Sequence, residues 1–438
     1  MKRNLKRNLI EWKNSEVRKP LLLQGARQVG KTYLVHDFGK SEYDNYVYLN
    51  FEKDIELRSF FQGNLNPEFI INNLNLYFGR TIDPNKTLIF FDEIQSAPEA
   101  ITALKYFYED APQYHLIAAG SLLGVSVGKQ SSFPVGKVTF MTMYPMTFDE
   151  YLVAIDEEML KAQISDPEKL INIPEVIHDR LTRHFKLYLY LGGMPEVLQS
   201  FIDNNDIAKA RKIQDDILKA YERDFSKYAD ARQAINTTEF WNSIPYQLAK
   251  ENKKFKYSDV RKNARASTFE LAIEWLKKAG LMNPSYNISV PKLPLGGYTN
   301  HSAFKVYLHD TGLLGAMLGL TSDNIVLPGK LYEEYNGAFI ENFVACELSA
   351  AGFQPLYYWT SKSDAEVDFV LQIDNEIYPV EVKSGKSKNL KSLRSYADKY
   401  KPRVIIRASP RPYTAIKDFV NIPIYAVGLI KNSRIVEV

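Results

Sequence analysis

The sequence predicts an α/β fold, in which a parallel sheet carries helices on both faces and further domains follow. Short apolar runs alternate with helical stretches over the first 160 residues, which is the order of a parallel sheet. One of these runs, Leu21–Leu23, leads directly into the glycine-rich segment GARQVGKT. The length of 438 residues exceeds one ordinary core and predicts two to four domains.

The composition narrows the class of protein. Apolar residues make up 45% and charged residues 24%, the balance of a globular protein in water. The net charge of +3 excludes a global attraction to polyanions, so any basic patch must be local. The single cysteine, Cys346, excludes a disulfide framework and favours a reducing, cytoplasmic location. No apolar run reaches the roughly 18 residues of a membrane span, so no membrane association is expected.

The segment 25–32 has the spacing G-x-x-x-x-G-K-T of a phosphate-binding loop (P-loop). Its glycines let the backbone curl so that N–H groups point at phosphate oxygens, and the following helix adds its positive end. We expect Lys31 to reach the β and γ phosphates of ATP and the Thr32 hydroxyl to bind Mg²⁺. The predicted nucleotide-binding residues are Gly25, Ala26, Arg27, Gln28, Val29, Gly30, Lys31 and Thr32.

A second apolar run, Thr87–Phe91, ends in Asp92 and Glu93 and has the form of a Walker B strand. We expect Asp92 to hold the Mg²⁺ shell and Glu93 to orient or deprotonate the attacking water. The alternative is an acidic pair on the surface. In a parallel sheet the P-loop and this acidic pair both follow carboxyl ends of strands, where ligands bind.

Over nearly its whole length the chain resembles prokaryotic AAA-type ATPases with a C-terminal domain of unknown function, DUF4143, that is related to restriction endonucleases. The resemblance depends on five motifs, of which the last two are long and distinctive: GARQVGKT, LIFFDEIQ, AAGSLLG, FPVGKVTFMTMYPMTFDEYL and YLYLGGMPEVLQSF. It implies a P-loop NTPase sheet, a helical linker, a winged helix and a nuclease-like α/β domain. The corresponding ranges are 1–160, 161–235, 236–300 and 301–438.

The resemblance also implies two roles near the γ-phosphate. Ser121, after the strand His115–Ala119, takes the place of the residue that senses this phosphate, although Gly-Ser is also an ordinary turn. Many AAA proteins receive an arginine finger from a neighbouring subunit, but the basic residue of FPVGKV is Lys137, which lacks the bidentate fork of arginine. Arg27 and Arg223 are weak candidates for a finger, because a surface or structural ion pair suits both residues better.

Residues 236–300 have the pattern of a winged helix, with helices expected over 240–249, 257–260 and 266–279 and a strand over 281–288. The segment from Lys253 to Lys278 contains eight basic residues and three acidic residues. Such a surface suits DNA phosphates, but winged helices also serve as protein docking modules.

The C-terminal third contains a second candidate site. Strands are expected over 366–371 and 377–383, joined by a turn, and alternation places Glu381 and Lys383 on one side. Asp368, on the neighbouring strand, can face them. Carboxylates in this arrangement suit Mg²⁺, and Lys383 would orient water or stabilise charge at phosphorus.

This pattern is similar to the D…(D/E)-x-K arrangement of restriction-endonuclease-like folds. In that fold an acidic residue on an earlier helix often completes the metal site, and Glu341 matches that place. The predicted site therefore combines the metal ligands Asp368, Glu381 and Glu341 with the catalytic Lys383. The domain could instead bind without cutting, since a fold does not secure a function.

The sequence thus favours a Mg²⁺-dependent ATPase that couples its nucleotide state to a nuclease-like domain in contact with nucleic acid. The expected partners are ATP, DNA and further copies of the chain. Two alternatives stay open. One is a DNA-binding regulator with an inactive nuclease-like scaffold, and the other is a nucleotide-gated protein–protein switch.

Overall fold

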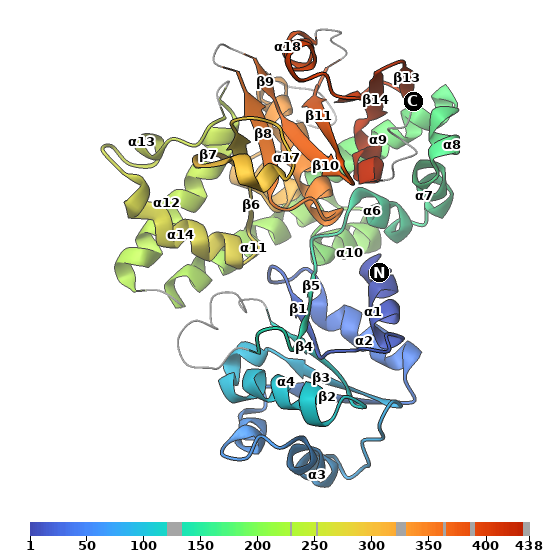
Figure 1. The fold of residues 1–438 in the computed structure, drawn as a ribbon, viewed down its shortest axis with the longest axis vertical. Helices are drawn as coiled ribbons and strands as arrows, with labels where there is room; N and C mark the ends of the chain where they lie inside the picture. Colours follow the sequence, from blue (N-terminus) through green and yellow to red (C-terminus); the bar gives the residue numbers. More distant parts are fainter. Residues whose placement is uncertain are drawn as a thin grey trace. The chain divides into compact units, whose positions relative to one another are not determined.

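The computed structural model describes residues 1–120, 134–227, 230–250, 253–320, 330–361, 365–385 and 390–431, and within 330–336 it describes the backbone alone. The chain divides into two compact units (Figure 1). The N-terminal unit comprises Lys2–Tyr144 and Lys278–Gly280, and the C-terminal unit comprises Pro145–Lys277 and Leu281–Val438. Each unit contains its own sheet structure and its own apolar core.

The N-terminal unit is built on a five-stranded sheet whose strands run parallel in the order β2-β3-β4-β1-β5. The strands are β1 (Leu21–Gln24), β2 (Asn45–Asn50), β3 (Thr87–Asp92), β4 (His115–Ala119) and β5 (Thr139–Thr142). The expected apolar strands are confirmed. The edge strand β5 is additional, and its partly exposed, threonine-containing sequence lacks the apolar run that marks a buried strand.

Helices cover both faces of this sheet, as the predicted fold class requires. They are α1 (Leu5–Lys13), α2 (Lys31–Glu42), α3 (Pro67–Phe78) and α4 (Pro98–Asp110), with the 3-10 segments η1 (Ile55–Phe61) and η2 (Ile94–Ser96). The ring of His36, on α2, lies 6.0 Å from the ring of Phe90. Phe91 points to the opposite face, into a core that α3, α4 and η1 complete.

The first half of the C-terminal unit is helical. Its helices are α6 (Phe148–Ala154), α7 (Glu158–Ser165), α8 (Pro167–Ile171), α9 (Glu175–Leu191), α10 (Pro195–Asn204), α11 (Ile207–Lys227), α12 (Ala231–Leu248), α13 (Tyr257–Val260) and α14 (Ala266–Lys278). Helix α15 (Thr311–Met317) comes later, in the half that also contains the sheets. None of the helices in the described parts of the chain is both long and apolar enough to cross a membrane.

The second half of this unit contains two mixed sheets. One has the order β7-β6-β8-β9, and the other has the order β10-β11-β12-β14-β13. Their strands are β6 (Met282–Ile288), β7 (Thr299–Leu308), β8 (Leu356–Thr360), β9 (Glu366–Val367), β10 (Phe369–Ile373), β11 (Glu376–Val382), β12 (Ile405–Ser409), β13 (Thr414–Ile416) and β14 (Phe419–Pro423). The expected single strand over 366–371 is divided, because β9 pairs with β8 whereas β10 pairs with β11.

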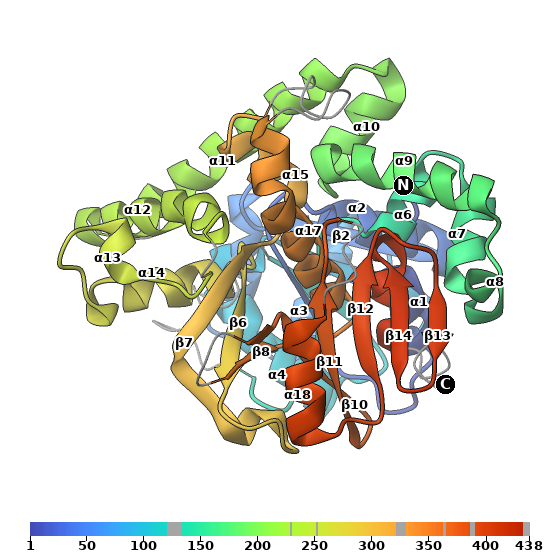
Figure 2. The same ribbon diagram turned by 90° about the horizontal axis from the view of Figure 1, so that it is seen from above.

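Two helices flank these strands (Figure 2). The long helix α17 (Lys330–Ala350) packs against strands of both sheets and against the 3-10 segment η4 (Ile424–Lys431). Helix α18 (Lys391–Tyr400) lies on the other side, where Leu393 and Tyr396 share an apolar core with Trp359 of β8. A third 3-10 segment, η3 (Leu295–Tyr298), precedes β7.

The two long sequence motifs meet inside the C-terminal unit. The Gly193 carbonyl accepts the Met146 N–H at 2.7 Å, and the Gly193 N–H donates to the buried Asp310 carboxylate at 2.6 Å. Gly192 has a φ of +70°, and a Cβ there would lie 2.2 Å from an Asp310 carboxylate oxygen. The Gly-Gly pair is therefore required by this close approach, and it ties the start of the unit to α15.

Candidate functional site

The P-loop runs from the end of β1 to the start of α2. Gly25 has a φ of +143°, and a Cβ there would lie 2.2 Å from the carbonyl oxygen of Met143. Any side chain would therefore strain the backbone and collide with the chain that continues β5. Gly30, at φ 94°, directly precedes the first residue of α2.

The Lys31 side chain folds back inside this loop. Its Nζ donates to the carbonyl oxygens of Gly25 at 2.9 Å and Ala26 at 2.7 Å. The residue is only 8% exposed. Burial lowers the pKa of Lys31 to about 8, although Glu93 and Asp92 act in the opposite direction. The ammonium group thus lies at the centre of the loop.

Asp92 lies at the carboxyl end of β3 and accepts hydrogen bonds from two neighbouring elements. Its Oδ2 accepts from the Thr32 hydroxyl of α2 at 3.0 Å and from the Tyr48 hydroxyl of β2 at 3.0 Å. The Asn50 amide donates in turn to the Tyr48 hydroxyl at 3.0 Å. Burial raises the pKa of Asp92, and these hydrogen bonds offset part of that effect. The structure therefore brings together Thr32 and Asp92, two of the predicted metal ligands.

Glu93 has an unusual backbone for a residue with a side chain, with φ at +50° in the left-handed region. Its N–H donates to Asp92 Oδ1 at 3.1 Å, and the Gln95 amide donates to its carboxylate. A left-handed non-glycine residue directly after a strand is a strained arrangement of the kind that concentrates at functional sites.

The remaining predicted loop residues lie between the two glycines. Ala26 and Val29 are buried, and Gln28 has φ at +65°. The charge of Arg27 contributes to the lowered pKa of Lys31. Ser121, the predicted sensor, lies outside the described residues.

Arg3 is a residue of this site that the sequence pattern did not reveal. Its Nη1 donates to the carbonyl of Val29, inside the P-loop, at 2.8 Å. Its Nη2 donates to the carbonyl of Tyr144, the last residue before the C-terminal unit, at 2.6 Å. The Arg3 guanidinium group therefore links the P-loop to the segment that ends at Tyr144.

The residues considered as arginine fingers lie in ordinary surroundings. Lys137 forms an ion pair with Glu109 at 3.0 Å and lies over the ring of Tyr108. Arg223 is exposed on α11. Neither environment distinguishes a finger from a surface cation.

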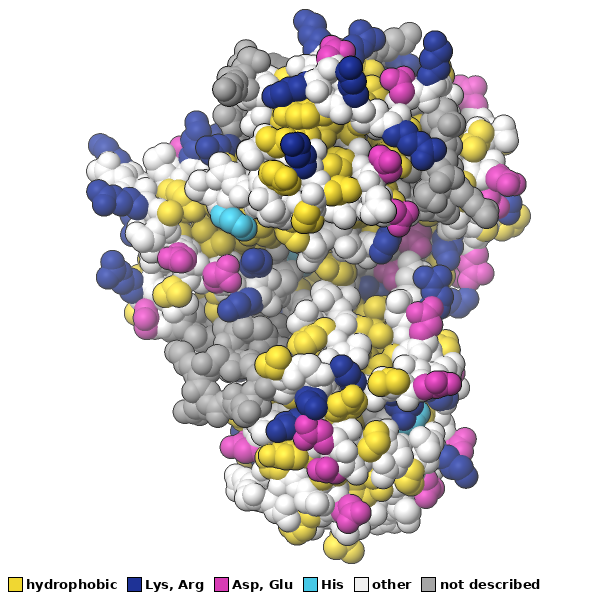
Figure 3. Space-filling view, viewed as in Figure 1, with side chains coloured by type: hydrophobic (Ala, Val, Ile, Leu, Met, Phe, Trp, Pro, Cys, Tyr) yellow, Lys and Arg dark blue, Asp and Glu magenta, His cyan; other side chains and the backbone are white. Residues whose placement is uncertain are grey.

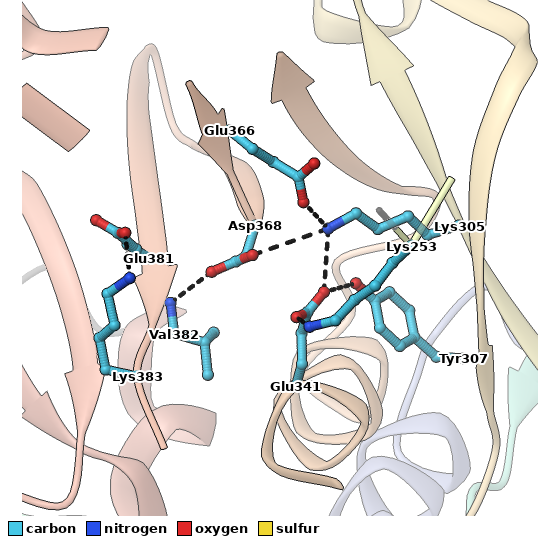
Figure 4. A network of polar contacts seen from close by, with 9 residues as sticks. All are labelled: Lys253, Lys305, Tyr307, Glu341, Glu366, Asp368, Glu381, Val382 and Lys383. Carbon is cyan, nitrogen blue, oxygen red and sulfur yellow. Dashed lines mark hydrogen bonds and ion pairs between the residues drawn. The ribbon is translucent and has the colours of Figure 1, made fainter. Parts of the chain in front are cut away.

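The second candidate site is a buried cluster of charges around Lys305 of β7 (Figure 4). The side chain of Lys305 is 0% exposed, and its Nζ lies 2.5 Å from Glu366, 3.1 Å from Glu341 and 3.8 Å from Asp368. Burial by itself lowers the pKa of Lys305, but these carboxylates hold that pKa well above its ordinary value. A protein cation therefore lies between three carboxylates.

Glu341, on α17, is fully engaged in this cluster. Its Oε1 accepts from Lys305 and from the Tyr307 hydroxyl, and its Oε2 is paired with Lys253. Burial raises the pKa of Glu341, but the two ammonium groups outweigh burial and hold that pKa well below its usual range.

Asp368 lies between β9 and β10, outside the regular alternation of either strand. Its Oδ1 faces Lys305, whereas its Oδ2 accepts the Val382 N–H at 2.8 Å. Burial, and then the charge of Glu341, raise the pKa of Asp368 to about 7. Asp368 lies where the chain changes its partner strand, and this position explains why its side chain faces Lys305. Alternation along the chain did not predict this contact.

Glu381 of β11 and Lys383, which directly follows the last residue of that strand, form an ion pair at 2.6 Å, as alternation predicts. Glu381 Oε2 is buried, with no hydrogen-bond partner among the described residues. The four residues of the predicted C-terminal site thus fall into two groups. Glu341 and Asp368 share Lys305, and Glu381 pairs with Lys383 (Figure 4).

The two sites differ in how well they suit a metal ion. Thr32 and Asp92 present oxygen ligands 3.0 Å apart beside the P-loop, and Mg²⁺ needs few protein ligands where phosphates and waters complete its shell. Within the described ranges, no group of three or more His, Cys, Asp or Glu side chains is placed to hold a metal ion. The carboxylates at Lys305 surround an ammonium group, so their arrangement does not fit a divalent cation.

Three regions of the chain match known families. Residues 17–152 match the AAA domain, and residues 336–427 match a domain of unknown function, DUF4143. The chain carries an AAA domain and a DUF4143 domain. Between them, residues 182–324 match a second domain of unknown function, DUF8612. The resemblance to AAA-type ATPases with a C-terminal DUF4143 domain is therefore confirmed.

Similar individual proteins add little about activity. Rv2008c of Mycobacterium tuberculosis and Mb2031c of Mycobacterium bovis, both uncharacterized, are each 37% identical over 95 residues, or 21% of this chain. The match spans 20% of the length of these curated relatives. The Walker-type ATPase PABY2304 of Pyrococcus abyssi is 16% identical, with a TM-score of 0.43 over 72% of this chain and 94% of that chain.

The charged cluster combines residues of two matched regions. Its carboxylates lie in the DUF4143 domain, and its cations and tyrosine lie in the DUF8612 match. The carboxylates are Glu341, Glu366 and Asp368, and their partners are Lys253, Lys305 and Tyr307. Only one signal in the sequence pointed to these partners, namely a lysine at position 305 inside the apolar run AFKVYL.

Proposed function

We propose that the AAA domain binds ATP together with Mg²⁺ and hydrolyses it, and that its nucleotide state controls what the C-terminal unit binds. One observation carries this proposal. The Thr32 hydroxyl lies 3.0 Å from the Asp92 carboxylate, directly beside a P-loop that encloses the Lys31 ammonium. Hydroxyl, carboxylate and ammonium are the groups that phosphoryl transfer on a P-loop requires.

Each residue has a distinct role in the proposed reaction. Lys31 exchanges its hydrogen bonds to the loop carbonyls for bonds to the β and γ phosphates. Thr32 and Asp92 would hold Mg²⁺, which neutralises negative charge on the phosphates. Glu93 accepts a proton from the attacking water or orients it. Ser121 remains the predicted sensor of the γ-phosphate.

The surroundings of Asp92 and Glu93 support these roles. The Tyr48 hydroxyl of β2 and the Thr32 hydroxyl of α2 both donate to Asp92 Oδ2, so the carboxylate is oriented before nucleotide arrives. Gln95 holds the Glu93 carboxylate in the same way. Two acidic side chains fixed by separate donors can perform separate tasks, one at the metal and one at the water.

The test is ATP hydrolysis by the purified full chain. Glu93→Gln is expected to retain ATP binding and to lose roughly 10²–10⁴-fold in turnover, because Gln cannot accept the proton. Lys31→Ala is expected to weaken ATP binding itself. Lys40→Ala, an exposed lysine on the same helix, serves as the control. Unchanged turnover in both Glu93→Gln and Lys31→Ala would refute the proposal.

We propose DNA as the partner of the C-terminal unit, through the part of the chain expected to form a winged helix. Helices α12 to α14 are followed by the antiparallel pair β6 and β7, the element order of that fold. Lysine and arginine side chains gather over these helices (Figure 3). The exposed basic residues of these helices and their connections include Arg232, Lys250, Lys254, Lys256, Arg261, Lys262, Arg265 and Lys277.

A salt titration separates DNA binding from a protein-docking role. Arg261 pairs with Glu239 and Lys250 pairs with Asp259, whereas Lys262 and Arg265 stand just before α14. The double variant Lys262→Ala, Arg265→Ala is expected to bind DNA more weakly and to lower the salt slope by about two phosphate contacts. Absence of DNA affinity at low salt, combined with an ATP-dependent change in oligomeric state, would favour the protein–protein switch.

A further inference from the structure

The cluster around Lys305 has the composition of a site whose cation is already present. Lys305 Nζ lies within 3.1 Å of oxygens of both Glu366 and Glu341, at a position that is fully buried. A magnesium ion would need the same oxygens at about 2.0–2.1 Å, in the space that the ammonium group fills. Two cations at that distance would repel each other strongly in a buried site.

The oxygens of the cluster are also committed to donors other than Lys305. The Tyr307 hydroxyl and the Lys253 ammonium group donate hydrogen bonds to the Glu341 carboxylate, and the Val382 N–H donates to Asp368 Oδ2. Around Lys305, three carboxylates face two ammonium groups, which leaves a net charge of only −1 before any metal is added (Figure 4). A divalent ion would gain little and would break these bonds.

Glu381 and Lys383 do not compensate for this loss. The Glu381 carboxylate has its own cation, at 2.6 Å, and the backbone N–H between these two residues, that of Val382, is bound to Asp368. Asp368 and Glu381 therefore contact different cations, Lys305 and Lys383, instead of sharing one.

We propose that Lys305 is the permanent cation of the DUF4143 carboxylate site, which therefore holds no catalytic metal and does not cut nucleic acid. The site instead fastens the region 182–324, which supplies Lys253, Lys305 and Tyr307, to the DUF4143 domain, which supplies the carboxylates. This inference goes beyond ATP hydrolysis and does not depend on it. The C-terminal unit then acts by binding alone.

Binding of Mn²⁺ to the nucleotide-free full chain, followed by electron paramagnetic resonance, tests the proposal. Thr32→Ala removes one of the two candidate metal ligands beside the P-loop, and Asp368→Asn then shows whether any remaining strong site lies in the DUF4143 domain. We expect Thr32→Ala protein to bind no Mn²⁺ tightly. In the double variant Thr32→Ala, Lys305→Met, we expect a new Mn²⁺ site, because the carboxylates lose their cation. We expect Asp368→Asn, introduced as a third substitution, to abolish that new site.

Two results would contradict the proposal that this site holds no metal. If Thr32→Ala protein with Lys305 intact binds a Mn²⁺ ion that Asp368→Asn removes, the proposal is wrong. Cleavage of plasmid DNA with Mn²⁺ that Asp368→Asn abolishes would overturn it as well. Both comparisons use Lys305-containing protein, so they remain decisive if Lys305→Met fails to fold. Loss of ATPase activity in any variant would bear only on the AAA domain.

Thermal unfolding gives a second readout for the fastening role. Lys305→Met removes one of the two ammonium groups that face Glu341, together with the ammonium group that faces Glu366 and Asp368. We therefore expect the melting midpoint of the C-terminal unit to fall by roughly 5–10 °C. Lys277→Met provides the control, since Lys277 is exposed and lies 3.8 Å from Glu274 on the surface of α14. A midpoint for Lys305→Met equal to that of Lys277→Met would contradict a fastening role.

Discussion

Replacement of Arg3 by alanine tests whether the P-loop is held in its binding conformation from outside the motif. Arg3 donates to the carbonyl of Val29 at 2.8 Å and to that of Tyr144 at 2.6 Å. Val29 belongs to the loop, and Tyr144 ends the first segment of the N-terminal unit. Without the guanidinium, the Val29 peptide loses a donor that fixes its orientation, and ATP must then order the loop itself.

The expected magnitude follows from these two hydrogen bonds. A bond from a charged donor contributes about 1.5–3 kcal/mol, and the lower end applies because the Arg3 contacts are only partly buried. The bond to Val29 bears directly on the loop, so about 1.5 kcal/mol corresponds to a roughly tenfold weaker affinity for ATP. Arg3→Lys reaches only one carbonyl at a time, and we expect an intermediate loss.

Titration with a fluorescent ATP analogue in Mg²⁺ buffer measures the affinity, and circular dichroism confirms that the variants fold. Arg7→Ala is the matched control, because the Arg7 side chain is 83% exposed and lies 3.8 Å from Glu11 on the same N-terminal helix. An affinity of Arg3→Ala within twofold of that of Arg7→Ala would refute the argument that this residue organises the loop.

Two further predictions concern a buried carboxyl group and the first glycine of the P-loop. Glu347 accepts the Phe148 N–H at 2.9 Å, and burial, followed by the charge of Asp149, raises the pKa of Glu347 to about 8. Because the pKa in the folded state exceeds the unfolded value, protonated Glu347 stabilises the fold at low pH, and this contribution is lost as the pH rises towards 8. Glu347→Gln keeps the acceptor but cannot ionise, so its free energy of unfolding should exceed that of the wild type by up to about 5 kcal/mol at pH 9 and match it at pH 4; equal pH profiles in thermal melts would contradict this. Gly25→Ala combines a left-handed φ with a contact of 2.2 Å to Met143, so ATP affinity should fall by more than roughly tenfold. Gly63→Ala separates the two causes, because Gly63 has φ +84° but nothing within 4 Å of its Cβ, and ATP binding by this variant should stay normal.

Local sequence was sufficient for the parallel sheet of the N-terminal unit. The runs that form β1, β3 and β4 are apolar on both faces, and such strands are stable only where helices cover both sides. The glycine spacing of the P-loop fixes where β1 must end and α2 must begin. Because the strands are parallel, their carboxyl ends meet at one edge, and this alone predicted that Thr32 and Asp92 would be neighbours.

The carboxylates of the C-terminal site show which contacts strand alternation can predict and which it cannot. Alternation placed Glu381 and Lys383 together correctly, since Glu381 lies in β11 and Lys383 directly follows the last residue of this strand. Alternation could not place Asp368, because the chain changes strand partner at that residue between β9 and β10. Alternation also gave no indication of Lys305. This residue lies 36 positions before Glu341 in the sequence and contacts it because the fold packs β7 against α17.

The sequence by itself therefore determined the class of the N-terminal fold, the P-loop and the acidic pair that follows β3. These features depend on contacts within one strand, one turn or one helix end, which a linear pattern records. Only the tertiary structure placed Arg3 on the Val29 carbonyl and Lys305 among the DUF4143 carboxylates. Charged side chains from distant segments pair wherever folding buries them together, and no periodicity along the chain encodes which of them will meet.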